Sequence, residues 1–104
     1  MDERAEAMML DLAPCLDGLA GAERDMTEDM LRTFCWYSVQ IDDLVHELDV
    51  EGVIIDTPKG FRANPANAVL HQYTQRRGDI YAKVLKVISG SGSVAADRLA
   101  EFVR

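Results

Sequence analysis

Apolar residues recur at helical spacing in three stretches of the chain, which predicts a mainly α-helical fold. The first stretch, residues 8–19, contains Pro14, and proline removes a backbone donor from a helix interior. The pattern therefore predicts a first helix that either starts near Pro14 or is kinked there.

The second stretch predicts a long helix with a continuous apolar seam. Its start is expected at Asp25 or Thr27, because Asp25 followed by Glu28 has capping-box character, and its end is expected at Gly52. The seam residues step by four and three positions: Met30, Phe34, Tyr37, Ile41, Leu44 and Leu48. This seam indicates either a core within one chain or an interface between copies.

Trp36 lies on the side of this helix away from the seam, where an indole would face water. Two interpretations remain open. Either the first or last helix covers Trp36 within one chain, or Trp36 belongs to an interface between subunits.

Residues 53–63 predict a β-hairpin between two long helices. Residues 53–57 and 61–63 have the character of strands, and Pro58, Lys59 and Gly60 supply the expected turn chemistry. A lone hairpin is marginally stable in water, so this one is expected to lean on the helices or pair with the hairpin of a neighbouring subunit.

The third stretch predicts a helix from Asn64-Pro65 to about Ile88, because Asn caps a helix and Pro suits its first position. Apolar residues cover one broad arc of this helix, and three basic residues line much of the opposite side: Arg76, Lys83 and Lys86. Arg77 falls inside the apolar arc, where its stem is expected to pack and its guanidinium to reach an acid on another helix or subunit.

The predicted fold is therefore mainly α with one short hairpin, and its three to four helices include long antiparallel ones. Residues 1–88 form the expected helical domain. Residues 89–93 read as a Gly/Ser linker, and residues 94–104 as an amphipathic tail that docks on its own domain or on a partner.

Charge is divided unevenly along the 104 residues. Residues 1–51 carry 3 basic and 14 acidic side chains, net −11, whereas residues 52–104 carry 8 basic and 4 acidic ones, net +4. This division indicates a surface for polyanions, head-to-tail attraction between copies, or simply two solvated faces. The candidate DNA-binding residues are Lys59, Arg62, Arg76, Lys83 and Lys86, and several copies would have to act together.

The sequence lacks a recognisable catalytic or metal-binding motif, and we expect a non-enzyme without cofactors. His46 and His71 are isolated, and Asp42 and Asp43 are neighbours whose side chains point about 100° apart on a helix. A small enzyme built on His71, Tyr73 and Asp79 is the weakest alternative, because these residues occupy different faces of one helix.

Cys15 and Cys35 have no CxxC spacing and are expected to be reduced core residues. No hydrophobic leader precedes them, and the longest apolar run is short. We therefore expect no membrane partner and a cytoplasmic location.

The order of these pieces resembles the short small subunits of tailed-bacteriophage terminases. The resemblance covers about residues 12–88 and includes Glu51-Gly52 at the helix end, TPKG at residues 57–60 and Asn64-Pro65. The chain departs from the family at SGSGSVAADRLAEFVR, which retains only Arg98 of a G-L-T-P-x-x-R segment. It also lacks the basic stretch that many members carry ahead of the first helix.

The resemblance implies a non-catalytic protein that assembles into a ring in the cytoplasm of an infected bacterial host. Such a protein would recognise viral double-stranded DNA where packaging starts, and would regulate the terminase large subunit, which holds the ATPase and nuclease. The residues expected at a core or oligomer interface are Phe34, Trp36, Tyr37, Ile41, Leu44, Leu48 and Arg77. The alternative is a purely protein-binding helical adaptor without DNA affinity.

Overall fold

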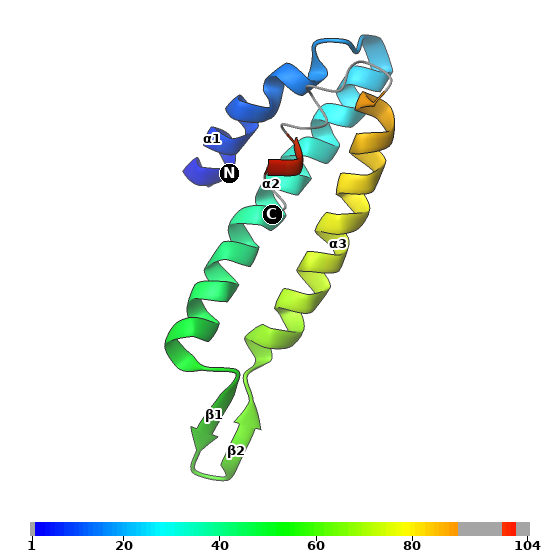
Figure 1. Cartoon of the computed structure of the whole chain (residues 1–104). Helices are drawn as coiled ribbons and strands as arrows, with labels where there is room; N and C mark the ends of the chain where they lie inside the picture. The colour runs from blue at the N-terminus through cyan, green and yellow to red at the C-terminus, as the bar shows by residue number, and fades with distance from the viewer. Residues whose placement is uncertain (1, 90–98, 102–104) are drawn as a thin grey trace.

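The computed structural model describes residues 2–89 and 99–101, and these residues form three α-helices, a short 3-10 segment and one β-hairpin (Figure 1). The elements in chain order are α1 (Glu3–Leu12), η1 (Ala13–Leu16), α2 (Gly21–Glu51), β1 (Ile54–Thr57), β2 (Gly60–Ala63) and α3 (Pro65–Ile88). The prediction of a mainly α fold, with long helices joined by a hairpin, is confirmed.

α1 begins well before Pro14, so the prediction of a helix that starts or kinks at this proline was wrong. The Asp2 carboxylate caps α1 by accepting a hydrogen bond from the backbone N–H of Arg4 at 2.8 Å. α1 ends at Leu12, and Pro14 lies in η1 instead. The α-helix thus ends two residues before the proline, which takes an early position of the 3-10 segment that follows, where its missing N–H is tolerated.

α2 begins at Gly21, so the prediction of a start at Asp25 or Thr27 was also wrong. The Arg24 guanidinium donates a hydrogen bond to the backbone oxygen of Leu16 at 2.8 Å, which ties the first turn of α2 to the end of η1. Thr27 is inside the helix, and its hydroxyl donates to the carbonyl four residues earlier. A contact with the preceding segment therefore overrides the local capping signal.

The far end of α2 lies where the sequence predicts it. Gly52 has φ +86°, a region that favours glycine, and its N–H donates to the Leu48 carbonyl at 2.8 Å. The chain then leaves the helix directly into the hairpin.

The hairpin pairs β1 with β2 in antiparallel register, with Ile54 opposite Ala63 and Asp56 opposite Phe61. At the turn, the Thr57 hydroxyl donates to the Gly60 carbonyl at 2.6 Å, and Gly60 has φ +108°. Because strand side chains alternate, Ile54 and Phe61 lie on one face, and Arg62 lies on the other.

Asn64 joins the hairpin to α3 through both ends of its side-chain amide. Its Oδ1 accepts from the Ala66 N–H at 3.0 Å and caps α3, while its Nδ2 donates to the Gly52 carbonyl at 2.9 Å. Pro65 occupies the first helical position, and α3 ends at Ile88, as predicted. This bond network closes the base of the hairpin.

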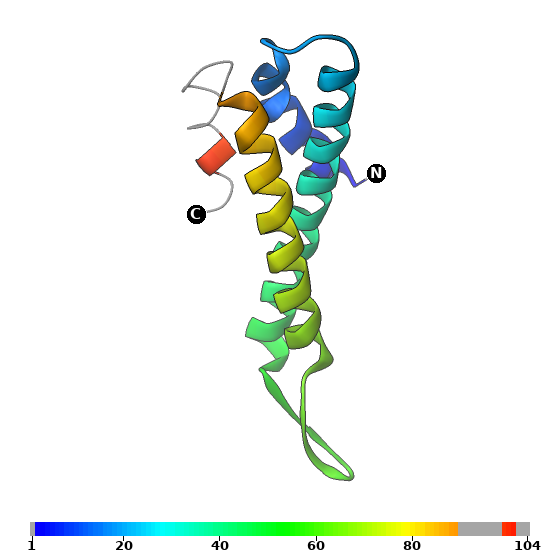
Figure 2. The same cartoon turned by 90° about the vertical axis from the view of Figure 1, so that its right-hand side faces the viewer.

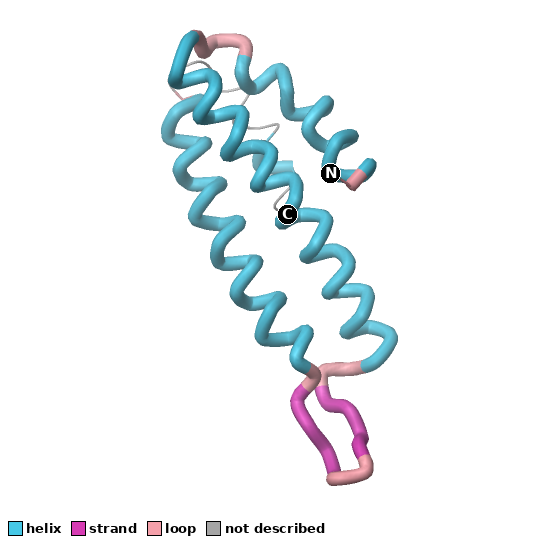
Figure 3. The backbone as a smooth tube through the Cα atoms, turned by 180° about the vertical axis from the view of Figure 1, so that it is seen from behind, coloured by secondary structure: helices cyan, strands magenta, loops and turns pink. Residues whose placement is uncertain are grey.

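The core lies where α1, η1, α2 and α3 meet. Figures 1 and 3 show α1 beside only the first part of α2, while α3 runs antiparallel along the other side of α2. The fully or nearly fully buried members of this core include Ala5, Met9, Leu12, Cys15, Leu16, Leu31, Phe34, Cys35, Val39, Val84, Ile88 and Leu99. The predicted core placement of both cysteines is confirmed, and burial raises the pKa of the Cys35 thiol to about 11, which makes it unreactive near neutral pH.

The molecule is elongated, with extents of 56 × 24 × 22 Å. We call the part where α1 flanks α2 the three-helix end, and the part from about residue 42 to residue 75 the hairpin end. At the hairpin end, the two long helices continue without α1, and the hairpin projects beyond them (Figures 1 and 2).

Within residues 2–89 and 99–101, no helix is both long and apolar enough to span a bilayer. The predicted linker and tail lie outside the described residues, apart from Ser89 and residues 99–101. Leu99 is fully buried in the core, so this part of the predicted tail packs on its own domain.

Candidate nucleic-acid interface

The outward face of α3 carries a stripe of three exposed basic side chains, Arg76, Lys83 and Lys86. Helical spacing places them within about 90° of arc and over about 15 Å of axis. One acid, Asp79, interrupts them. We call Arg76, Lys83 and Lys86 the α3 stripe.

The other two predicted DNA-binding residues lie on the hairpin. Lys59 is in the turn between β1 and β2, and Arg62 is in β2 opposite Ile55. Both side chains are exposed. The hairpin thus presents two cations at the tip of the molecule.

The structure does not bring these two groups into one patch. Four strand residues and about eleven helical residues separate Lys59 from Arg76, which places them about 30 Å apart along the long axis. The five candidate residues therefore do not form one surface. They form two separate groups, the α3 stripe and the hairpin pair Lys59 and Arg62. Of the two groups, the α3 stripe is the longer row of cations on one helix face, with Asp79 between Arg76 and Lys83.

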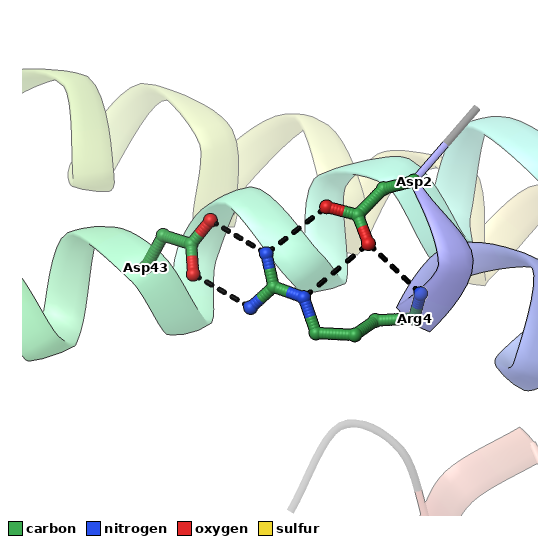
Figure 4. A network of polar contacts seen from close by, with 3 residues as sticks. All are labelled: Asp2, Arg4 and Asp43. Atoms are coloured by element: carbon green, nitrogen blue, oxygen red, sulfur yellow. Dashed lines mark hydrogen bonds and ion pairs between the residues drawn. The ribbon is translucent and has the colours of Figure 1, made fainter.

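The basic residues of α1 and α2 are occupied by contacts within the chain. Arg4 forms a two-pronged ion pair with Asp43, at 2.7 and 2.9 Å, and also contacts the Asp2 carboxylate (Figure 4). The guanidinium lowers the pKa of both carboxyl groups, chiefly through hydrogen bonds, and they in turn raise the pKa of Arg4.

Arg32 and Arg24 are engaged as well. Arg32 lies 3.4 Å from Glu28 and 3.7 Å from Glu6, and Arg24 donates to the Leu16 carbonyl. By contrast, none of the five candidate DNA-binding residues forms an ion pair with any residue in the described part of the chain. Among the residues described, the cations without an ion pair are therefore concentrated on the hairpin and α3.

Arg77 is neither ion-paired within the described residues nor fully exposed. Its side chain is half-buried on α3, and desolvation lowers its pKa, while the charge of Asp42 on α2 opposes that shift. Asp42 is not within ion-pair distance, so Arg77 has packed its stem without acquiring the predicted partner among the residues described. We expect it to support the packing of α3 rather than to reach phosphates.

The predicted seam of α2 faces α3. The rings of Phe34 and Tyr81 lie 6.5 Å apart, and those of Tyr37 and Tyr73 lie 5.2 Å apart. Phe34 and Ile41 are buried, and the other four seam residues are half-buried: Met30, Tyr37, Leu44 and Leu48. Packing within the chain therefore accounts for the seam without a partner helix from another copy.

Trp36 is partly covered within the chain by α3, the last of the three α-helices in the described residues, which is one of the two interpretations that the sequence left open. Its ring lies 5.6 Å from that of Tyr73 on α3 and 5.1 Å from that of Tyr37. Trp36 remains 38% exposed and borders an open depression of about 380 Å³ with Arg32 and Thr33. The sequence contains a signal for the contact between Trp36 and Tyr73, since Tyr73 has the helical spacing of a residue that faces α2.

The residues considered for other chemistry do not converge. His46, His71 and Asp79 are exposed, whereas Tyr73 is half-buried in the aromatic cluster. In the described part of the chain, no group of three or more His, Cys, Asp or Glu residues is placed to hold a metal ion.

No family model, no curated protein and no solved structure matches this chain.

Proposed function

We propose that the chain is a non-catalytic, homo-oligomeric adaptor that binds double-stranded phage DNA where packaging starts and regulates the terminase large subunit. Its place of action is the cytoplasm of the infected bacterium. The observation that supports the DNA contact is that the basic side chains of the chain fall into two groups. Those of α1 and α2 are engaged within the chain, and those of the α3 stripe form no ion pair with any described residue.

The α3 stripe suits sequence-independent contact with phosphates. Its three cations are exposed on one helix face, and releasing counterions from DNA favours such contacts at low salt. Three cations from one copy support only weak binding. An oligomer that presents several stripes to one duplex would gain affinity through effective concentration, which supports a role as an assembled particle.

The order of the elements also supports the adaptor proposal. A long helix that ends at Gly52, a tight hairpin and a second long helix capped by Asn64 occur in the order that the family resemblance implies. The ring arrangement and the link to the large subunit come from that resemblance alone, and they are part of the proposal.

A salt series of DNA-binding measurements tests the proposed contact. The triple variant Arg76→Ala, Lys83→Ala, Lys86→Ala is expected to bind duplex DNA more weakly, with a salt slope that falls by about one for each phosphate that it no longer neutralises. The matched control is Gln72→Ala, Gln75→Ala, which alters uncharged residues on the same exposed face. If the triple variant and the control bind DNA with the same affinity and slope, the α3 stripe is not the DNA contact.

A purely protein-binding adaptor is the second candidate, and the depression beside Trp36 favours it. Its lining residues Arg32, Thr33, Trp36 and Tyr37 combine an exposed aromatic edge with polar groups, which is typical of protein interfaces. Trp36→Ala would then abolish partner capture by a protein that shows no DNA affinity at any salt concentration. Salt-sensitive DNA binding by the wild-type chain would exclude this second candidate.

A further inference from the structure

The hairpin end leaves large apolar side chains in water. Phe61 is 80% exposed and Ile54 is 66% exposed on one face of the hairpin, and Val50 at the end of α2 is 70% exposed. The hairpin projects beyond the helix pair (Figure 2). Because a two-stranded hairpin is marginal in water, these side chains are expected to be covered in the working assembly.

A second uncovered surface lies beside the hairpin, on α2. At the three-helix end, α1 covers the α2 face that carries Cys35 and Val39, and the Arg4–Asp43 pair marks where this cover stops. The same face continues toward the hairpin, one heptad further on, and is open to solvent there. We call it the distal face, and its residues are Asp42, Val45, His46, Asp49 and Val50.

The hairpin and the distal face are complementary in charge. The distal face contributes two carboxylates, and the sequence contains no lysine or arginine from residue 33 to residue 58. The hairpin supplies Lys59 and Arg62 against one acid, Asp56, which lies on the same face as Phe61 and Ile54, so the hairpin as a whole has a net positive charge. Arg62 lies on the hairpin face opposite Phe61. Because a hairpin is only one layer thick, the charge of Arg62 would still lie within about a Debye length of the distal face, roughly 10 Å at 0.1 M salt.

The two surfaces are also similar in length. A strand of four residues extends about 13 Å, and the distal face from residue 42 to residue 50 extends about 12 Å along its helix. Phe61 and Ile54 therefore match a surface that carries Val45 and Val50, and Lys59 at the tip matches its carboxylates.

We propose that the hairpin of one copy docks on the distal face of a second copy of this chain. Each copy carries one hairpin and one distal face, so repeating this contact can close a pair or a ring. The inference rests on the self-assembly in the proposed function. It is separable from the DNA contact, because the hairpin tip lies about 30 Å from the nearest residue of the α3 stripe.

The apolar part of the contact is tested by Phe61→Ser, with Leu10→Ser as its matched control. Leu10 is 76% exposed on α1, so both changes remove a large apolar side chain from the surface. Phe61→Ser is expected to weaken self-association by about 10- to 100-fold in sedimentation or light scattering, and Leu10→Ser to leave it unchanged. Equal association by the two variants would overturn the proposal.

The charge complementarity is tested by exchanging signs between two variants. The hairpin variant is Lys59→Glu, Arg62→Glu, and the face variant is Asp42→Lys, Asp49→Lys. Each alone places like charges together and is expected to stay monomeric, whereas a mixture of the two restores assembly. The control for the face variant is Glu47→Lys, Glu51→Lys, which makes the same charge change on the opposite side of α2 and should assemble normally.

Three outcomes contradict the proposal: a wild-type chain that is a strict monomer, single variants that assemble like the wild type, and a mixture that stays monomeric. Circular dichroism of each variant checks that the helices are retained. The α3-stripe triple variant completes the design, because it is expected to assemble normally and lose DNA affinity. Failure of the hairpin contact and failure of the DNA contact are thus distinguished by different variants.

Discussion

The three-helix end and the hairpin end of this molecule place similar side chains in opposite environments. Phe34 is fully buried between α2 and α3, whereas Phe61 on the hairpin is 80% exposed. Arg4 is held by two aspartates, whereas Lys59 and Arg62 form no ion pair with the described residues. At the three-helix end these side chains make contacts within the chain, whereas at the hairpin end the corresponding apolar and basic side chains are exposed.

The comparison predicts its largest effect for a pair of phenylalanine truncations. Phe34→Ala removes a fully buried ring from the core and is expected to lower the free energy of unfolding by about 3–5 kcal/mol. Phe61→Ala should change it by no more than about 0.5 kcal/mol when measured on dilute, dissociated protein. Urea denaturation measures the free energy of unfolding of both variants. An equal loss of free energy in the two would mean that Phe61 contributes to the stability of the fold as much as Phe34 does.

A smaller effect is expected for two glycines that differ in backbone conformation. Gly52 has φ +86° at the start of the hairpin, so Gly52→Ala should destabilise the fold by about 1–2 kcal/mol. Gly78 lies inside α3 with open space around its Cβ position, so Gly78→Ala should stabilise by up to about 1 kcal/mol. Thermal unfolding measures both, and a stabilising Gly52→Ala would contradict the strained junction.

The smallest effect concerns the ion pairs that attach α1 to α2. The pKa values of Asp2 and Asp43 are lowered by Arg4, so their contribution is present above the ordinary aspartate pKa near 4 and is lost as pH falls below it. Arg4 and Asp43 are exposed and Asp2 is half-buried, so the gain is small. In Arg4→Gln, carboxyl titration by NMR should move both pKa values upward, and unchanged titrations would show that Arg4 is not their partner.

Elements with strong local signals could be predicted from the sequence. The Asn64-Pro65 start of α3, the Gly52 end of α2 and the turn before Gly60 each depend on capping or on backbone conformation within a few residues. The start of α2 could not be predicted. The local signal at Asp25 was outweighed by the hydrogen bond from Arg24 to Leu16, which exists only once η1 is folded.

The candidate site was predictable as a set of residues, but not as an arrangement. Sequence periodicity identifies the α3 stripe, whereas it does not reveal that Arg4 is neutralised by Asp43, 39 positions away, or that Lys59 is far from Arg76. The distal face was missed for the same reason. It exists because α1 is ten residues long and α2 is thirty-one, so part of the covered side of α2 remains open.

The most direct test of the central claim is the mass of the wild-type particle with and without duplex DNA, measured by light scattering at low salt. We predict a multiple of the 11.6 kDa chain that binds DNA as an assembly and releases it as salt is raised. A particle with the mass of one chain that DNA leaves unchanged would contradict an oligomeric DNA-recognition adaptor.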